Sequence, residues 1–165
     1  MKKILFVLIL WLISGLSLAD QEAGIYKYVH IASGSTIRLD VNEMKIILDG
    51  HSVLAVSDCV QKTGYRCLVS EGGSFVFPTG QLAKQMTWEF NGQEFNVVRK
   101  VSGQLFGRNY SGFIVHSRLG DDNYWYLFSP LNGLLAFGAL GELNTSSTFI
   151  LEGECGFAAQ NGCKH

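Results

Sequence analysis

The chain has 165 residues, of which 47% are hydrophobic, 16% are charged and only 2 are proline. This length fits a single domain, and this composition excludes a disordered or collagen-like chain, because both have too few apolar side chains to form a packed core. The 13 basic and 14 acidic residues give a net charge of -1 and are scattered along the chain. That balance argues against a nucleic-acid groove and against a polybasic membrane patch.

The first nineteen residues differ from the rest in composition. Two lysines precede an apolar stretch at residues 4–16, and Ser17-Leu18-Ala19 then places small residues at the first and third positions. This pattern predicts a secretory signal peptide, residues 1–19, that is cleaved before Asp20. A transmembrane helix is the weaker reading, because 13 apolar residues fall short of the roughly 20 needed to cross a bilayer. We therefore expect a single periplasmic or secreted domain, residues 20–165, with no stable membrane anchor after cleavage.

All four cysteines, Cys59, Cys67, Cys155 and Cys163, follow the predicted leader. An even number of cysteines in an exported chain indicates disulfides. Local pairing of Cys59 with Cys67 and of Cys155 with Cys163 is favoured, because each pair lies eight residues apart across a segment rich in turn formers. The alternatives are a catalytic thiol and a metal site. Both are disfavoured, because no C-x-x-C spacing is present and no pair of histidines lies near a cysteine.

Period-two alternation of apolar and polar residues predicts strands at residues 25–31 and 36–41. The only candidate for helix is a short turn at residues 80–86, which is too short to be stable alone. No low-complexity tract or linker divides the chain. We expect an all-β fold, an antiparallel sandwich or barrel of roughly eight to ten strands.

Three Asp-Gly or Asn-Gly pairs mark hairpin turns, at Asp49-Gly50, Asn91-Gly92 and Asn132-Gly133. A two-residue loop at Asn91-Gly92 makes Phe90 oppose Gln93, Glu89 oppose Glu94 and Trp88 oppose Phe95, with Met86 and Val97 on the face of Trp88. The same count at Asp49-Gly50 makes Ile46 oppose Val53 and Met44 oppose Ala55, on a face shared with Leu48 and His51. Because Pro130 cannot donate in a ladder, the third connection is expected to be a longer loop at residues 129–133, between strands at 124–128 and 134–137. The regular spacing of the three turns leaves a threefold, β-trefoil-like architecture as the alternative fold.

Signatures of the common hydrolases, nucleotide-binding proteins and calcium-binding loops are absent from the sequence. His116, with Asp121 and Asp122 in the following turn, is the best candidate for a scattered hydrolase site. Ser117 cannot complete a triad with His116, because adjacent strand residues point to opposite faces. The simpler reading is a surface histidine beside a polar turn. No catalytic residue, metal site or cofactor is therefore predicted.

Glu89 and Glu94 are expected to face each other across the second hairpin, where like charges are destabilising. Such a pair can act as a general acid and a general base, or it can bind a cation. Solvation, with screening by Arg99 or Lys100, is the preferred interpretation. The segment Asp121-Asp122-Asn123 lacks the alternating ligands of a calcium loop and is read as a turn.

The aromatic run from residue 124 to 128 is the most suggestive segment for binding. Its side chains would alternate between two apolar faces, so either this strand is covered on both sides, which is the preferred reading, or one face is an exposed aromatic patch. The candidate binding residues are Tyr124, Trp125, Tyr126 and His116.

Three functions follow from these observations. The first is an exported, disulfide-containing binding module that recognises another protein, such as an inhibitor or an immunity-type protein. The second is a carrier that holds a small apolar ligand. The third is a hydrolase with a site around His116.

Overall fold

The computed structural model describes residues 23–59, 64–70, 73–83, 85–105, 107–140 and 148–160. These residues form twelve β-strands and no helix, so the described part of the chain contains no helical segment that could span a membrane. The strands are β1 (Ile25–His30), β2 (Thr36–Asp40), β3 (Lys45–Leu48), β4 (Ser52–Ala55), β5 (Tyr65–Ser70), β6 (Gly73–Pro78), β7 (Thr87–Phe90), β8 (Gln93–Leu105), β9 (Arg108–Leu119), β10 (Asp122–Ser129), β11 (Gly133–Ala139) and β12 (Thr148–Leu151). The predicted signal peptide, residues 1–19, lies outside the described residues.

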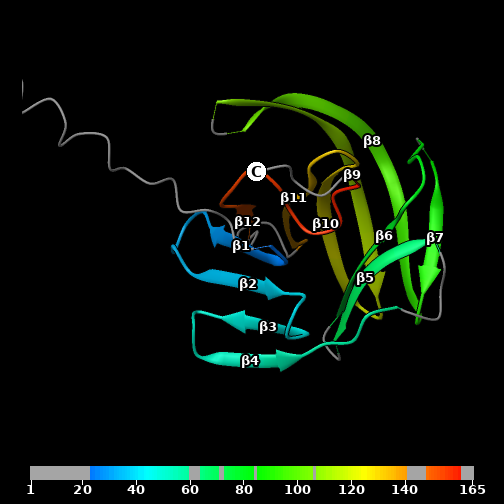
Figure 1. Ribbon diagram of the computed structural model, residues 1–165. Coiled ribbons are helices and arrows are strands. Elements are labelled where there is room, and N and C mark those ends of the chain that lie inside the picture. Colours follow the sequence, from blue (N-terminus) through cyan, green and yellow to red (C-terminus); the bar gives the residue numbers. More distant parts are fainter. Residues whose placement is uncertain are drawn as a thin grey trace, which may run out of the picture.

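Ten strands form one open antiparallel sheet in the order β4-β3-β2-β1-β12-β11-β10-β9-β8-β7. The sheet consists of two meanders, β1–β4 and β7–β12, which join where β1 pairs with β12. Strands β5 and β6 form a separate hairpin, which lies against the inner side of the curved sheet in Figure 1. The all-β, antiparallel prediction is confirmed. Among the described strands, this order does not divide into the three equivalent units of a trefoil.

The two strands predicted from alternation are present as β1 and β2. The candidate helical turn at residues 80–86, which the sequence indicates is too short to be stable alone, is not a helix in the described part of that segment. There the amide of Met86 donates to the carbonyl of Ala83 at 3.1 Å, and Gln85 has a φ of 65°, so the chain makes a single turn and no helix. A segment this short gains too few backbone hydrogen bonds to offset the cost of helix nucleation.

The hairpin at Asn91-Gly92 has the predicted register, with Trp88 opposite Phe95, Glu89 opposite Glu94 and Phe90 opposite Gln93. Both turn residues have positive φ, 51° and 76°. The loop length therefore fixes the register, and the predicted apolar face of this hairpin lies in the core.

The register predicted at Asp49-Gly50 is wrong by one residue. Both turn residues have positive φ, as expected, but His51 is an extra residue between the turn and the ladder. Leu48 therefore opposes Ser52, and Ile46 opposes Leu54 in place of Val53. The third connection is a longer loop, as predicted, although β10 and β11 extend until Ser129 opposes Gly133. Pro130 lies in that loop, where its missing N–H breaks no ladder bond.

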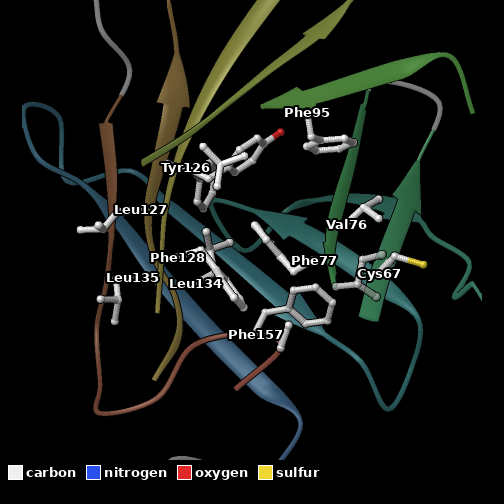
Figure 2. Close-up of a cluster of buried hydrophobic side chains, with 14 of the residues drawn as sticks. Cys67, Val76, Phe77, Phe95, Tyr126, Leu127, Phe128, Leu134, Leu135 and Phe157 are labelled. Carbon is white, nitrogen blue, oxygen red and sulfur yellow. The ribbon is translucent and has the colours of Figure 1, made fainter. Parts of the chain in front are cut away.

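The core lies between the curved sheet and the β5–β6 hairpin. Phe77 of β6 stacks on Phe128 of β10, with ring centroids 4.2 Å apart, and Phe75 packs edge-to-face against Phe137 at 5.0 Å. Figure 2 shows Phe77 and Phe128 together with Phe157, which follows β12 in the chain. Aromatic pairs in these geometries add to the hydrophobic gain from burial, so this cluster fixes the hairpin onto the sheet.

A buried polar network also ties the hairpin to the sheet. The side-chain oxygen of Gln93 accepts a hydrogen bond from the backbone amide of Ser74 at 2.9 Å, and its Nε2 donates to Ser117 Oγ at 2.6 Å. The same Nε2 lies 3.4 Å from the Tyr126 hydroxyl, which donates to the Ser74 carbonyl at 3.5 Å. All four residues are buried, so every member depends on the others for its hydrogen bonds.

After β12 the chain passes back between the sheet and the hairpin. The amide of Gly156 donates to the Asn132 carbonyl at 2.7 Å, and the amide of Leu134 donates to the Phe157 carbonyl at 2.8 Å. On the hairpin side, Arg66 donates to the carbonyls of Ala159 and Gln160. We call residues 152–160 the C-terminal segment; backbone hydrogen bonds hold it to the sheet, and the Arg66 side chain holds it to the hairpin.

Cys59 and Cys67 form the predicted disulfide, with their Cα atoms 5.7 Å apart. This bridge excludes cross-pairing of either residue with Cys155. The predicted partner of Cys155, Cys163, lies outside the described residues.

Candidate binding cleft

Strands β8 and β9 extend beyond their neighbours as a two-stranded arm, which we define as residues 101–105 and 107–112. β9 pairs with β10 only from Phe113 onward, whereas β8 and β9 stay paired as far as Leu105 and Arg108. The register shifts between Val97 and Arg99, just before the arm, and such a bulge bends a strand and increases its twist. Figure 1 shows the far end of β8 and β9 curving over toward β12 and β1.

A cleft of about 660 Å³ lies between the arm and the strands β1, β11 and β12. Its volume is within the range of roughly 300 to 1,000 Å³ that is usual for small-molecule sites. The apolar residues that line it are Val29, Ile31, Leu105, Leu135, Ile150 and Leu151. The polar and charged residues that line it are His30, Arg108, Asn109, Asn132, Glu152 and Glu154.

The apolar floor exists because the central strands carry apolar residues on both faces. Val29 pairs with Ile150, and Ile150 pairs with Ala136, so a row of small and aliphatic residues crosses three strands on the face away from the aromatic core. In Figure 2, Leu127 and Leu135 point to the opposite side of their strands from Phe128. The arm covers part of this second apolar face, and the cleft lies where that cover is incomplete.

Two ion pairs lie at the edge of the cleft. Arg108 on the arm lies 2.7 Å from Glu154, and Lys27 lies 2.6 Å from Glu152. All four side chains are about half-exposed or more, so each pair contributes little to stability. The Arg108–Glu154 pair is nevertheless the one charged contact among the described residues that joins the arm to the C-terminal segment.

Three neutral polar groups at the cleft use their acceptor atoms within the protein. His30 Nδ1 accepts from the backbone amide of Ser33 at 3.0 Å. Asn109 Oδ1 accepts from Gln104 Nε2 at 3.1 Å, and Asn132 Oδ1 accepts from the Ser129 hydroxyl at 3.3 Å. The remaining groups on these side chains, an imidazole Nε2–H and two amide NH₂ groups, are donors.

The candidate residues chosen from the sequence lie elsewhere and do not form one site. Tyr126 is buried in the core network, and burial raises the pKa of its hydroxyl above that of a solvated tyrosine. Tyr124 is half-buried on the same face of β10, and burial again raises its pKa. Trp125 lies on the opposite face, directly across from the exposed His116. The aromatic run is thus divided between two faces, as alternation requires.

His116 lies in a second, more polar depression of about 520 Å³ over β7, β8 and β9, together with Glu89 and Glu94. Glu94 pairs with Arg118 at 3.0 Å, and not with the expected Arg99 or Lys100. Asp121 and Asp122 do not line this depression, and neither makes a hydrogen bond or ion pair with His116 among the described residues. Ser117 is buried on the other face, as predicted.

The described residues contain no group of three or more histidine, cysteine, aspartate or glutamate side chains that is placed to hold a metal ion. The cleft-lining residues were not predicted from the sequence, because they come from four separate segments: β1 with the residues after it, the arm, β11 with the loop before it, and β12 with the residues after it. The available signal was the run Leu134-Leu135-Ala136-Phe137, which is apolar at every position and therefore marks a strand covered on both faces.

No family model, curated protein or solved structure matches this chain.

Proposed function

We propose that this protein is an exported binding module that holds an aliphatic ligand in the cleft beneath the arm. The observation that carries the proposal is the cleft itself, in which aliphatic side chains from β1, β11, β12 and the arm converge on one space. Burial of an alkyl chain there is favourable by about 0.8 kcal/mol for each methylene removed from water. The side chains present thus suit a ligand with an aliphatic part.

Two features support an exported location. The first is the leader-like composition of residues 1–19. The second is the disulfide between Cys59 and Cys67, since disulfides form and persist in oxidising compartments.

The test is binding of an apolar naphthylamine fluorophore, whose emission rises when it leaves water. Leu105 lines the cleft, so Leu105→Ser should weaken binding by about tenfold or more, because full burial of a leucine side chain is favourable by about 1.5 to 3 kcal/mol. Leu131→Ser is the matched control, because Leu131 is 67% exposed and does not line the cleft. Equal loss in both variants, or no binding by the parent protein, would contradict the proposal.

Protein recognition is a second candidate, and the edge strand β4 favours it. Val53 and Leu54 are 58% and 45% exposed. Strand β4 contains no charged residue or proline, the residues that commonly prevent an edge strand from pairing with another chain. The amide of Val56 bonds the Met44 carbonyl across the ladder, so by alternation Leu54 bonds to β3, whereas Val53 and Ala55 direct their backbone groups to the open edge. An extended segment of a partner protein with alternating apolar residues would fit this edge as an added strand.

The matching variant is Val53→Pro, which removes an edge N–H and leaves the bonds to β3 intact. Strand addition predicts that a partner retained by the parent protein is lost by Val53→Pro and kept by Leu131→Ser. It also predicts that the partner protects the amides of Val53 and Ala55 from hydrogen exchange. A partner that binds Val53→Pro with unchanged affinity would exclude this edge.

A further inference from the structure

We infer that the ligand of the arm cleft is an amphiphile with a single carboxylate head, such as a fatty-acid-like molecule. The inference rests on the proposed function and adds the chemistry of the head group. The reason is that polar side chains at the cleft have their acceptor atoms bonded within the protein, whereas their donor groups are left for a ligand.

The neutral side chains at the cleft present donors. His30, Asn109 and Asn132 each commit an acceptor atom to a neighbour within the protein, at 3.0, 3.1 and 3.3 Å respectively. Within the described part of the chain, the other polar groups of these three side chains have no protein partner. A ligand head that accepts hydrogen bonds satisfies them, whereas a head that only donates does not.

Arg108 supplies the positive charge. Its guanidinium has five N–H donors, and it contacts Glu154 through Nη2 at 2.7 Å. Because this pair is largely exposed, it is weak, and a ligand carboxylate can share or replace the Glu154 contact at little cost. A carboxylate also matches the planar, two-pronged geometry of guanidinium better than a hydroxyl does.

The acidic residues restrict the head to one negative charge. Glu152 and Glu154 both line the cleft, so a doubly charged phosphate monoester would meet more repulsion than a carboxylate. An ammonium head only donates, so it would leave the donors of His30, Asn109 and Asn132 unsatisfied, and the Arg108 guanidinium would repel it. The carboxylates of Glu152 and Glu154 are exposed and already contact Lys27 and Arg108, so they would give an ammonium head only weak ion pairs.

The experiment compares dodecanoate, dodecanol and dodecylammonium at neutral pH, below their aggregation limits, by displacement of the naphthylamine fluorophore. Dodecanoate should bind at least about tenfold more tightly than dodecanol, because hydrogen bonds to a charged group are worth about 1.5 to 3 kcal/mol. Dodecylammonium should bind most weakly. Each methylene added to the carboxylate series should tighten binding by up to about fourfold until the cleft is full.

Arg108→Gln should reduce dodecanoate binding to within about threefold of dodecanol and leave dodecanol itself unchanged. Arg99→Gln is the control, since Arg99 is exposed on β8 and does not line the cleft. If all three ligands bind equally, or if Arg108→Gln binds dodecanoate normally, the head-group inference is overturned and the proposed function stands. If none of them displaces the probe and the probe itself does not bind, the proposed function fails as well.

Discussion

The hydroxyl of Tyr28 lies 3.2 Å from the backbone nitrogen of Phe157, from which it accepts a hydrogen bond, and 3.0 Å from the carbonyl of Leu134, to which it donates. One fully buried side chain on β1 thus joins β11 to the C-terminal segment. Because that segment also carries Glu152 and Glu154, this contact helps to place one side of the arm cleft.

Replacement of Tyr28 by phenylalanine should lower the free energy of unfolding by about 1 to 3 kcal/mol. The reason is that two buried backbone groups lose their partner, with little change in side-chain volume. Urea unfolding of the intact protein measures the effect. Tyr124→Phe is the control, because the Tyr124 hydroxyl makes no hydrogen bond among the described residues, and it should change stability much less. Equal effects would show that the Tyr28 contacts contribute nothing specific.

Gly156→Ala should destabilise the protein by at least about 2 kcal/mol, since a Cβ at this position would lie 1.8 Å from the backbone oxygen of Leu134. That neighbour is backbone of β11, where Leu134 pairs with Phe128 of β10, so it cannot move aside without disturbing the sheet. Thermal unfolding of Gly156→Ala and Gly80→Ala provides the comparison. Nothing lies within 4 Å of a Cβ built at Gly80, so the control should retain the parental melting temperature. A parental melting temperature for Gly156→Ala would contradict the close approach.

Gln93→Leu should cost about 1 to 3 kcal/mol, because the buried amide of Ser74 and the hydroxyl of Ser117 both lose their partner. The exposed Gln104 offers a matched Gln→Leu control. Amide exchange at Ser74, read by nuclear magnetic resonance, should also speed up in Gln93→Leu. Unchanged protection of this amide would mean that the network does not hold the hairpin on the sheet.

Alkaline pH should destabilise the fold from about pH 10 upward. Burial raises the pKa of the Tyr28 and Tyr126 hydroxyls above the ordinary 10.0, so the unfolded chain releases these protons at a lower pH than the folded one. The two protonated hydroxyls contribute fully to the free energy of unfolding below their pKa in the unfolded chain. This contribution is lost as pH rises through their pKa in the folded protein. Each tyrosine adds a slope of up to about -1.4 kcal/mol per pH unit. Unfolding titrations should show a shallower slope for Tyr126→Phe, and an identical slope would contradict the assignment.

Loss of the Cys59–Cys67 bridge, as in the double Cys→Ser variant, should lower stability by about 2 to 3 kcal/mol, the modest value expected for a short loop. Peptide mapping of the non-reduced protein checks the connectivity and should also find Cys155 linked to Cys163. A peptide that joins Cys59 to Cys155 would overturn the local pairing.

Local chemistry explains what the sequence could predict. Alternation located β1 and β2, and Asn91-Gly92 gave the correct register because the two-residue turn leads directly into the ladder. Asp49-Gly50 has the same turn chemistry, but the ladder begins one residue later, at Ser52. That shift is set by how β4 pairs with β3, and no turn residue signals it.

The cleft could not be predicted because it depends on long-range contacts. Val29 and Ile150 become neighbours only when the first and last strands of the two meanders pair. Leu105 lines the same cleft as Val29 and Ile150 because the arm bends over toward β1 and β12. In the aromatic run at residues 124–128, Tyr126 and Phe128 pack in the core. This is the structural role expected of a strand that is covered on both faces.

The most direct test of the central claim is a titration of methyl-labelled protein with dodecanoate, followed by nuclear magnetic resonance. A ligand site beneath the arm predicts saturable shifts at the methyl groups of Val29, Leu105 and Ile150, with those of Val53 and Leu54 on β4 unchanged. Shifts confined to β4, or no saturable shift at any methyl group, would contradict a ligand site beneath the arm.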